Sequence, residues 1–183
     1  MRLGKFPTFF LLVALAALAA SVFGALHNQL SYSVGPDYFH AIKFPQFAIP
    51  EGTPPRLGAA QVGVLASWWM GAAVGLPAFL YGLIAVPTGR SYFAAGLGGI
   101  GLVVMVSTFA ALLGLLGGIV SESTGLLGPV GTPEGVDRAD YLRAGFMHDA
   151  TYFGGMLGAL VAIWPMHRAR AIDTARLNRM QAG

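Results

Sequence analysis

The chain has 183 residues, of which 55% are hydrophobic and only 10% are charged, and 26 are glycine. This composition excludes an ordinary soluble globular domain and favours an integral membrane protein. Cysteine is absent, which excludes disulfides, thiolate metal sites, cysteine nucleophiles and iron–sulfur clusters. The net charge of +3 does not indicate nucleic-acid binding, because membrane orientation explains where the bases lie.

Four apolar segments are long enough to cross a bilayer as helices. Residues 57–89, 91–121 and 150–166 contain no charged side chain, and another apolar run lies near the N-terminus. A spanning helix needs about 20 apolar residues. The sequence therefore predicts one all-α membrane domain over residues 1–183. Its expected parts are spans at 6–26, 58–86, 92–120 and 146–166, outer loops at 27–57 and 121–145, and a tail at 167–183.

The first apolar segment has two interpretations. Arg2 and Lys5 precede it, and Ala-Leu-Ala at 17–19 resembles a signal-peptidase site, which is the pattern of a cleaved signal peptide. The apolar run continues to Leu26, whereas the core of a signal peptide has roughly 7 to 15 residues. We expect a retained anchor, with cleavage as the alternative.

The bases are concentrated on one side of this topology. The termini and the turn between the second and third spans carry Arg2, Lys5, Arg90, Arg168, Arg170, Arg176 and Arg179, with Asp173 as their only acid. By the positive-inside rule, this side faces the cytoplasm. We expect a bacterial inner-membrane protein with both termini cytoplasmic and both long loops on the outer face.

The first outer loop is unusually rich in aromatic residues. Pro36 can begin a short helix that places Tyr38 and Phe39 in the membrane interface. We expect this segment to lie as a lid across the outer mouth of the helices.

Glycines four residues apart recur in the later spans. Small residues let helices approach closely in a bilayer, where no hydrophobic effect drives association. The pattern predicts a compact four-helix bundle, and a homo-oligomer contact is the alternative. The pairs are Gly71 with Gly75, Gly114 with Gly118, and Gly154 with Gly158.

Trp68 and Trp69 are adjacent in the second span. They lie about ten residues into that helix, at a rise of about 1.5 Å per residue well below the membrane surface. They either fill the space left by the glycines or form a cofactor-binding pocket for a flat hydrophobic ligand such as a quinone, carotenoid or porphyrin.

Ionisable residues gather at the outer ends of the spans, at His27, Glu122, His148 and Asp149. Imidazole and carboxylate groups bind zinc, iron and manganese, so these four are the candidate ligands of a divalent transition metal. The Glu-x-x-His signature of di-iron bundles is absent. The alternatives are side chains that anchor helix ends at the interface, or a role in proton relay or ligand gating.

Several short motifs carry a family resemblance. They are HNQLSY at 27–32, PDYF at 36–39, KF at 43–44, WWMG at 68–71 and HD at 148–149. Together they resemble a group of uncharacterised bacterial four-span inner-membrane proteins over most of the chain. Asn28 stands where that pattern has an acid, which argues against a ligand role there. The resemblance implies the topology and no activity.

No Walker loop, dinucleotide fingerprint, nucleophile elbow or zinc-protease helix is present, so no common enzyme class is indicated. The leading hypothesis is a small non-enzymatic accessory or scaffold protein of a larger membrane assembly. Its partners would be the bilayer and either another membrane protein or a second copy. The alternative is a metal- or cofactor-binding redox protein with a His/carboxylate site at the outer face. A small permease is the third possibility.

Overall fold

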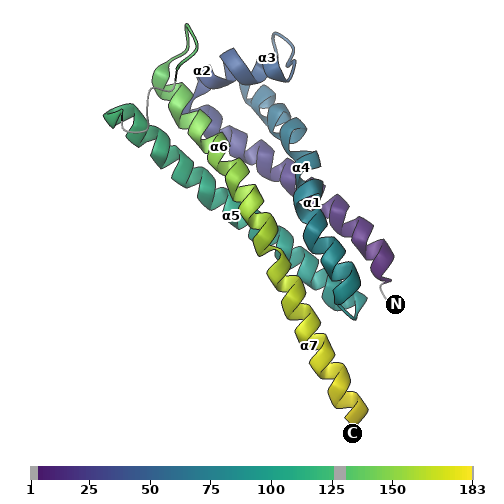
Figure 1. Ribbon diagram of the computed structural model, residues 1–183. Coiled ribbons are helices and arrows are strands. Elements are labelled where there is room, and N and C mark those ends of the chain that lie inside the picture. The colour runs from purple at the N-terminus through teal and green to yellow at the C-terminus, as the bar shows by residue number, and fades with distance from the viewer. Residues whose placement is uncertain (1–3, 126–130, 183) are drawn as a thin grey trace.

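The computed structural model describes residues 4–125 and 131–182, which form helices and short connections with no strand among them. In chain order these are α1 (Lys5–Val34), α2 (Pro36–Tyr38), the π-helical turn η1 (Phe39–Lys43), α3 (Phe44–Gln46), α4 (Pro55–Ala85), α5 (Gly89–Thr124), α6 (Arg138–Val161) and α7 (Ile163–Ala182). The long helices run side by side, with α2 and α3 across one end and α7 extending past the other (Figure 1). The all-α prediction is confirmed in the described part of the chain.

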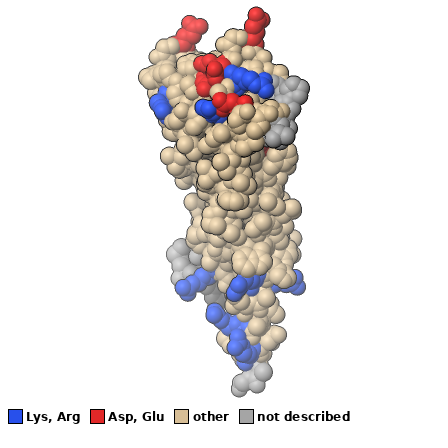
Figure 2. All heavy atoms as spheres, turned by 90° about the vertical axis from the view of Figure 1, so that its left-hand side faces the viewer, with Lys and Arg blue, Asp and Glu red and all other residues tan. Residues whose placement is uncertain are grey.

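Three of these helices, α1, α4 and α5, are long and apolar enough to cross a membrane. Figure 2 shows the charged side chains of one face gathered towards the two ends, with a wide uncharged belt between them. An apolar belt between polar ends is the surface that a bilayer requires. The molecule therefore has the character of a helical membrane protein.

Both expected outer loops contain more helix than the sequence indicated. Helix α1 continues past His27 to Val34 because its polar residues find partners on α4, where the Asn28 amide donates to the Ala59 carbonyl over 3.0 Å. Helix α6 begins at Arg138 because the Asp137 carboxylate accepts from the Asp140 backbone N–H at 3.0 Å. Residues 126–130 of the second loop lie outside the described residues.

The fourth expected span, residues 146–166, is not one helix. It includes the end of α6 at Val161, the break at Ala162 and the start of α7. Pro165 explains the break, since proline has no N–H and its ring excludes the carbonyl four residues earlier, which is that of Val161. The helix therefore stops there and starts again.

The long helices pack as two close pairs, α1 with α4 and α5 with α6. Glycine makes both contacts possible. Gly24 of α1 faces Gly63 of α4 backbone to backbone, and a Cβ added at Gly118 of α5 would lie 2.6 Å from the Leu142 carbonyl oxygen of α6. Each pair therefore excludes side chains along its closest line of contact.

The end of the molecule opposite α2 and α3 is closed by polar contacts. The Tyr92 side chain is fully buried, and its hydroxyl donates to the Phe79 carbonyl at 2.9 Å. Asp173 of α7 is 4% exposed, and its carboxylate accepts from the hydroxyls of Thr88 and Ser91, each at 2.8 Å. These bonds attach α7 to the first turn of α5. The start of α1 and the end of α7 both lie at this end of the molecule (Figure 1).

Candidate functional site

Two histidines from different helices meet at the lid end. His27 of α1 and His148 of α6 have ring centroids 4.9 Å apart, arranged edge to face. Ser31, one turn beyond His27, places its hydroxyl oxygen 2.9 Å from Nε2 of His148. Since His148 is 7% exposed, this hydrogen bond satisfies one ring nitrogen of a buried imidazole. The histidine pair thus joins α1 to α6.

The lid, defined as α2, η1 and α3, covers this pair with aromatic rings. The Tyr38 and Phe39 centroids lie 5.4 and 5.8 Å from that of His148. The Asp37 backbone N–H donates to Oδ2 of Asp140 at 2.9 Å, which fixes the start of the lid to α6. The aromatic segment therefore lies over the helix ends, in the position expected for it.

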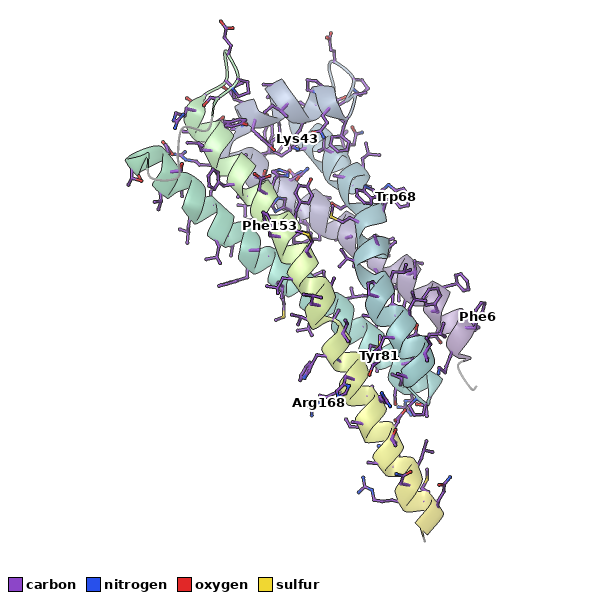
Figure 3. The ribbon with its side chains drawn as sticks, viewed as in Figure 1. Phe6, Lys43, Trp68, Tyr81, Phe153 and Arg168 are labelled. Carbon is purple, nitrogen blue, oxygen red and sulfur yellow. The ribbon has the colours of Figure 1, made fainter. Side chains whose placement is uncertain are left out.

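Lys43 is the one lysine of the lid, and it is only 8% exposed. Its Nζ donates to Oε1 of Gln46 at 3.2 Å and lies 5.3 Å from the centre of the Tyr38 ring. No carboxylate in the described ranges lies within ion-pair distance of it. Burial lowers the pKa of the Lys43 amine, and the negative charge of Asp149 opposes that shift. Figure 3 shows Lys43 at the lid end of the molecule, far from Phe6.

His27 has an unused ring nitrogen. Its Nε2 is buried and has no hydrogen-bond partner in the described part of the chain. An unsatisfied buried polar atom costs about 1–3 kcal/mol. The remaining faces of the ring are packed, with Phe23 stacked at a centroid distance of 5.7 Å. This nitrogen is therefore available to a group that enters the site.

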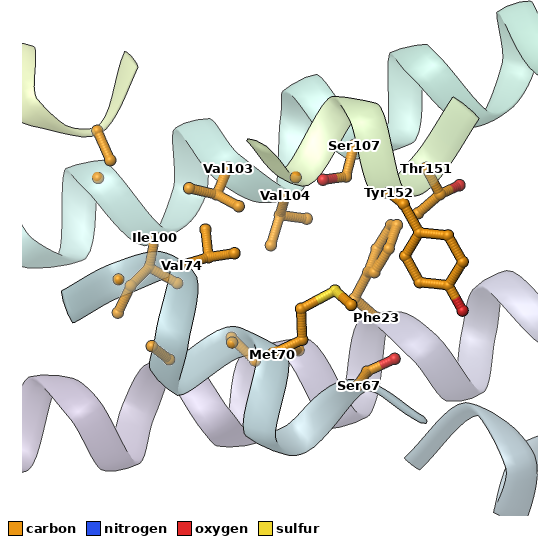
Figure 4. A pocket seen from close by; sticks show the side chains of 18 of the residues that line it. Phe23, Ser67, Met70, Val74, Ile100, Val103, Val104, Ser107, Thr151 and Tyr152 are labelled. Carbon is orange, nitrogen blue, oxygen red and sulfur yellow. The ribbon is translucent and has the colours of Figure 1, made fainter. Parts of the chain in front are cut away.

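A crevice of about 90 Å³ lies deeper in the molecule, between the α1/α4 pair and the α5/α6 pair. Most of its wall is apolar, for example at Val74 and Ile100. Figure 4 shows the hydroxyl groups of Ser67, Thr151 and Tyr152 together towards one end. The crevice is therefore an apolar space with a polar end.

A smaller pocket of about 30 Å³ adjoins that polar end. Phe23, Ser67, Thr151 and Tyr152 line both spaces. The walls of the smaller pocket also include His27, Asn28, Lys43 and His148. The two spaces therefore adjoin each other at these four residues, and the larger one is apolar between the helix pairs while the smaller one is polar beneath the lid.

The four predicted metal ligands do not converge. His27 and His148 are neighbours, but Glu122 is held by Arg143 through contacts of 2.8 and 3.0 Å. Asp149 is exposed. Across residues 4–125 and 131–182, no group of three or more His, Asp or Glu side chains could hold a metal ion. The predicted set is reduced to a histidine pair because Glu122 already has a cation partner and Asp149 lies on another face of α6 from His148.

The tryptophan pair does not line the crevice. Trp68 and Trp69 are 53% and 51% exposed, and Figure 3 shows Trp68 pointing away from the other helices. Their neighbours Ser67 and Met70 face inward instead. The prediction of a pocket lined by the tryptophans is corrected by this placement, because the inward face of α4 at this level falls one residue to either side of the pair.

Sequence reasoning missed several residues of the site. Ser31 could have been found, since a residue four positions after His27 shares its face if the helix continues. Lys43 carried a weaker signal, as the one lysine in an aromatic segment. Tyr152, which lines both spaces, lies four positions after His148 and so shares its side of α6.

Comparison with known proteins gives no further guide. No family model matches the sequence, and neither a curated protein nor a solved structure matches it. The resemblance to four-span bacterial proteins stays an expectation.

Proposed function

We propose that this chain is a four-span protein of the bacterial inner membrane, with α1, α4, α5 and α6 crossing the bilayer and the lid on the outer face. The apolar character of α1, α4 and α5 supports the first part. Helix α6 is less apolar but is paired with α5 along its length. The end opposite the lid carries Arg90 and the arginines of α7, which supports a cytoplasmic position for it.

The absence of cysteine makes this topology directly testable. Glu51→Cys lies beside the lid and Arg179→Cys lies near the end of α7, and both positions are exposed. In intact spheroplasts, a membrane-impermeant maleimide should label the first variant and not the second. The reverse pattern, or equal labelling of both, would contradict the proposed orientation.

The function that the site supports best is binding of an apolar small molecule between the two helix pairs. The observation that carries it is the crevice of about 90 Å³, with apolar walls and hydroxyls at one end. Ligand sites are concave and mostly apolar, with a few polar groups that set orientation. The space lies between elements that are otherwise closely packed, which distinguishes it from a general packing defect.

Val104 and Met105 provide a matched pair for the test. Val104 lines the crevice, whereas Met105, the next residue of α5, is 65% exposed on the outside of the bundle. The wild type, Val104→Phe and Met105→Phe should be purified in mild detergent and measured by native mass spectrometry for a bound apolar molecule. We expect bound ligand in the wild type and in Met105→Phe, and little in Val104→Phe.

Wild-type protein without any bound small molecule, and unable to take one up, would remove the proposal. Equal occupancy in Val104→Phe and Met105→Phe would place the ligand elsewhere on the protein. Circular dichroism of the three samples checks that they are equally folded.

The accessory-subunit hypothesis is the second candidate, favoured by the exposed Trp68 and Trp69. Large aromatic side chains facing outward deep in a span provide a contact for another helix. A Trp68→Ala/Trp69→Ala double variant should then lose a partner or second copy that co-purifies with the wild type. A wild type that is monomeric and without partners in native purification would count against this candidate.

A further inference from the structure

We propose that the bound molecule is a long-chain amphiphile with an anionic head group, held with its head beneath the lid beside Lys43 and His27 and the adjoining part of its chain in the crevice. This inference rests on the proposed binding function and names the chemical class of the ligand.

The first argument is the order of polarity across the two adjoining spaces. The crevice between the helix pairs is lined mainly by aliphatic side chains and glycine. Towards the lid come the hydroxyls of Ser67, Thr151 and Tyr152, and then the ring of His27 and the ammonium group of Lys43. A molecule with an apolar chain and a polar head fits these two spaces in one orientation, with its head towards the lid.

The second argument concerns the hydrogen-bonding character of the polar end. Nζ of Lys43 has three hydrogens and donates one of them, to Gln46. Nε2 of His27 has no partner within the described residues, and Ser67 and Tyr152 make no hydrogen bond through their hydroxyls there. Most of these groups can donate, so they fit a head group that accepts hydrogen bonds.

The third argument is charge. Lys43 is a buried cation without a carboxylate in ion-pair contact, and a buried charge is stabilised chiefly by pairing. The Tyr38 ring and the more distant Asp149 compensate that charge only in part. An anionic head group in the small pocket would complete the pairing, which favours a carboxylate or phosphate over a neutral alcohol.

The experiment compares head groups on one chain length. The full-length protein, delipidated in neutral detergent, is incubated with equal amounts of hexadecanoate, hexadecanol and phosphatidylglycerol, repurified, and its retained lipids are measured by mass spectrometry. We expect the wild type to retain at least one of the two anionic lipids about tenfold more than hexadecanol, as one charge-assisted hydrogen bond would provide. Preference for hexadecanoate identifies a free fatty acid as the source, and preference for phosphatidylglycerol identifies a membrane lipid.

Three lysine variants locate the selectivity. Lys43→Met should lose the preference, Lys43→Arg should keep most of it, and Lys5→Met, at the opposite end of α1, should behave as the wild type. Persistence of the preference in folded Lys43→Met would overturn the assignment of the head group to this site. The wild-type comparison tests the proposal even if Lys43→Met does not fold.

The two proposals fail differently. Equal retention of hexadecanoate, hexadecanol and phosphatidylglycerol by the wild type, lost in Val104→Phe, would overturn the anionic head group and leave the binding crevice intact. No retention of any of them by the wild type, together with no uptake of other apolar molecules, would overturn both.

Discussion

The contacts within each helix pair differ from the contacts between the two pairs, although glycine is abundant in both. Within the pairs, glycine brings backbone against backbone, as at Gly24 with Gly63 and at Gly118 with Leu142. Between the pairs the result depends on the level. At the crevice, a Cβ added at Gly155 would meet only the Ser107 hydroxyl oxygen, at 3.9 Å, whereas further from the lid the side chain of Leu12 fills the space beside Gly96. The same residue type therefore closes the contact within each pair and leaves the contact between the pairs open at the level of the crevice.

The largest effect is expected where glycine closes an interface. In Gly118→Leu the new Cβ would lie 2.6 Å from the Leu142 carbonyl oxygen and 2.8 Å from Cα of Arg143. Both are backbone atoms, which cannot move aside as a side chain can, so α5 and α6 must separate. We expect a loss of about 3 kcal/mol or more in the free energy of unfolding, at the upper end of overpacking effects. Thermal unfolding in detergent, followed by circular dichroism, measures it.

Gly101 of the same helix provides the control, since a Cβ there would meet nothing within 4 Å. Gly101→Leu should unfold close to the wild-type temperature. If both variants were equally destabilised, the cause would be the loss of glycine from α5 and not the contact with α6.

A smaller loss is expected where α7 is attached to α5. Asp173→Ala leaves the hydroxyls of Thr88 and Ser91 without their buried acceptor. A hydrogen bond to a charged group contributes about 1.5–3 kcal/mol, so the unfolding temperature should fall. Glu51→Ala, which removes an exposed acid at the other end, should leave it unchanged. A stable Asp173→Ala protein would show that these bonds are replaced by water.

Filling the crevice between the pairs should increase the stability of the protein. Val104→Phe adds apolar volume to the crevice between the pairs, and filling a cavity commonly adds about 0.5–2 kcal/mol of stability. The unfolding temperature of delipidated protein should rise relative to the wild type and to Met105→Phe. A loss as large as that of Gly118→Leu would mean that the two interfaces are equally tight, and the contrast between them would disappear.

The smallest effect is expected at the rim of the α5/α6 pair. The Arg143–Glu122 ion pair has side chains 36% and 30% exposed, so solvent and salt weaken it. Arg143→Met should cost about 0–1 kcal/mol, and the difference from the wild type should shrink at high salt. Unfolding curves at low and high ionic strength measure this. A large loss that does not depend on salt would show that Arg143 acts through packing.

The long segments without charged residues predicted much of the fold, because each helix that spans a bilayer needs a long uncharged run. The positions of α1, α4 and α5 follow from this. The break at Ala162 was harder to predict, since a proline near the end of an apolar run is equally consistent with the end of a helix and with a break followed by another helix. The continuation of α1 to Val34 depends on Asn28 finding a backbone acceptor on α4, which no local pattern reveals.

The site was predictable only in part for a related reason. His27 and His148 were identified because ionisable groups at membrane depth are rare. Their grouping with Glu122 and Asp149 was wrong. It considered only that each residue lies near the outer end of a span, and not which face of its helix the residue occupies. Whether a carboxylate faces the histidines or an arginine depends on helix rotation, which only the packed structure supplies.

The attachment of Asp173 to Thr88 and Ser91 has a consequence for the order in which the protein is made. The N-terminus of α5 leaves the ribosome long before Asp173 is translated. These two hydroxyls therefore have no carboxylate acceptor until a residue more than eighty positions downstream has been added. Until then the start of α5 lacks this carboxylate acceptor. The turn between α4 and α5 therefore gains its contacts with α7 only in the last stage of synthesis of this chain.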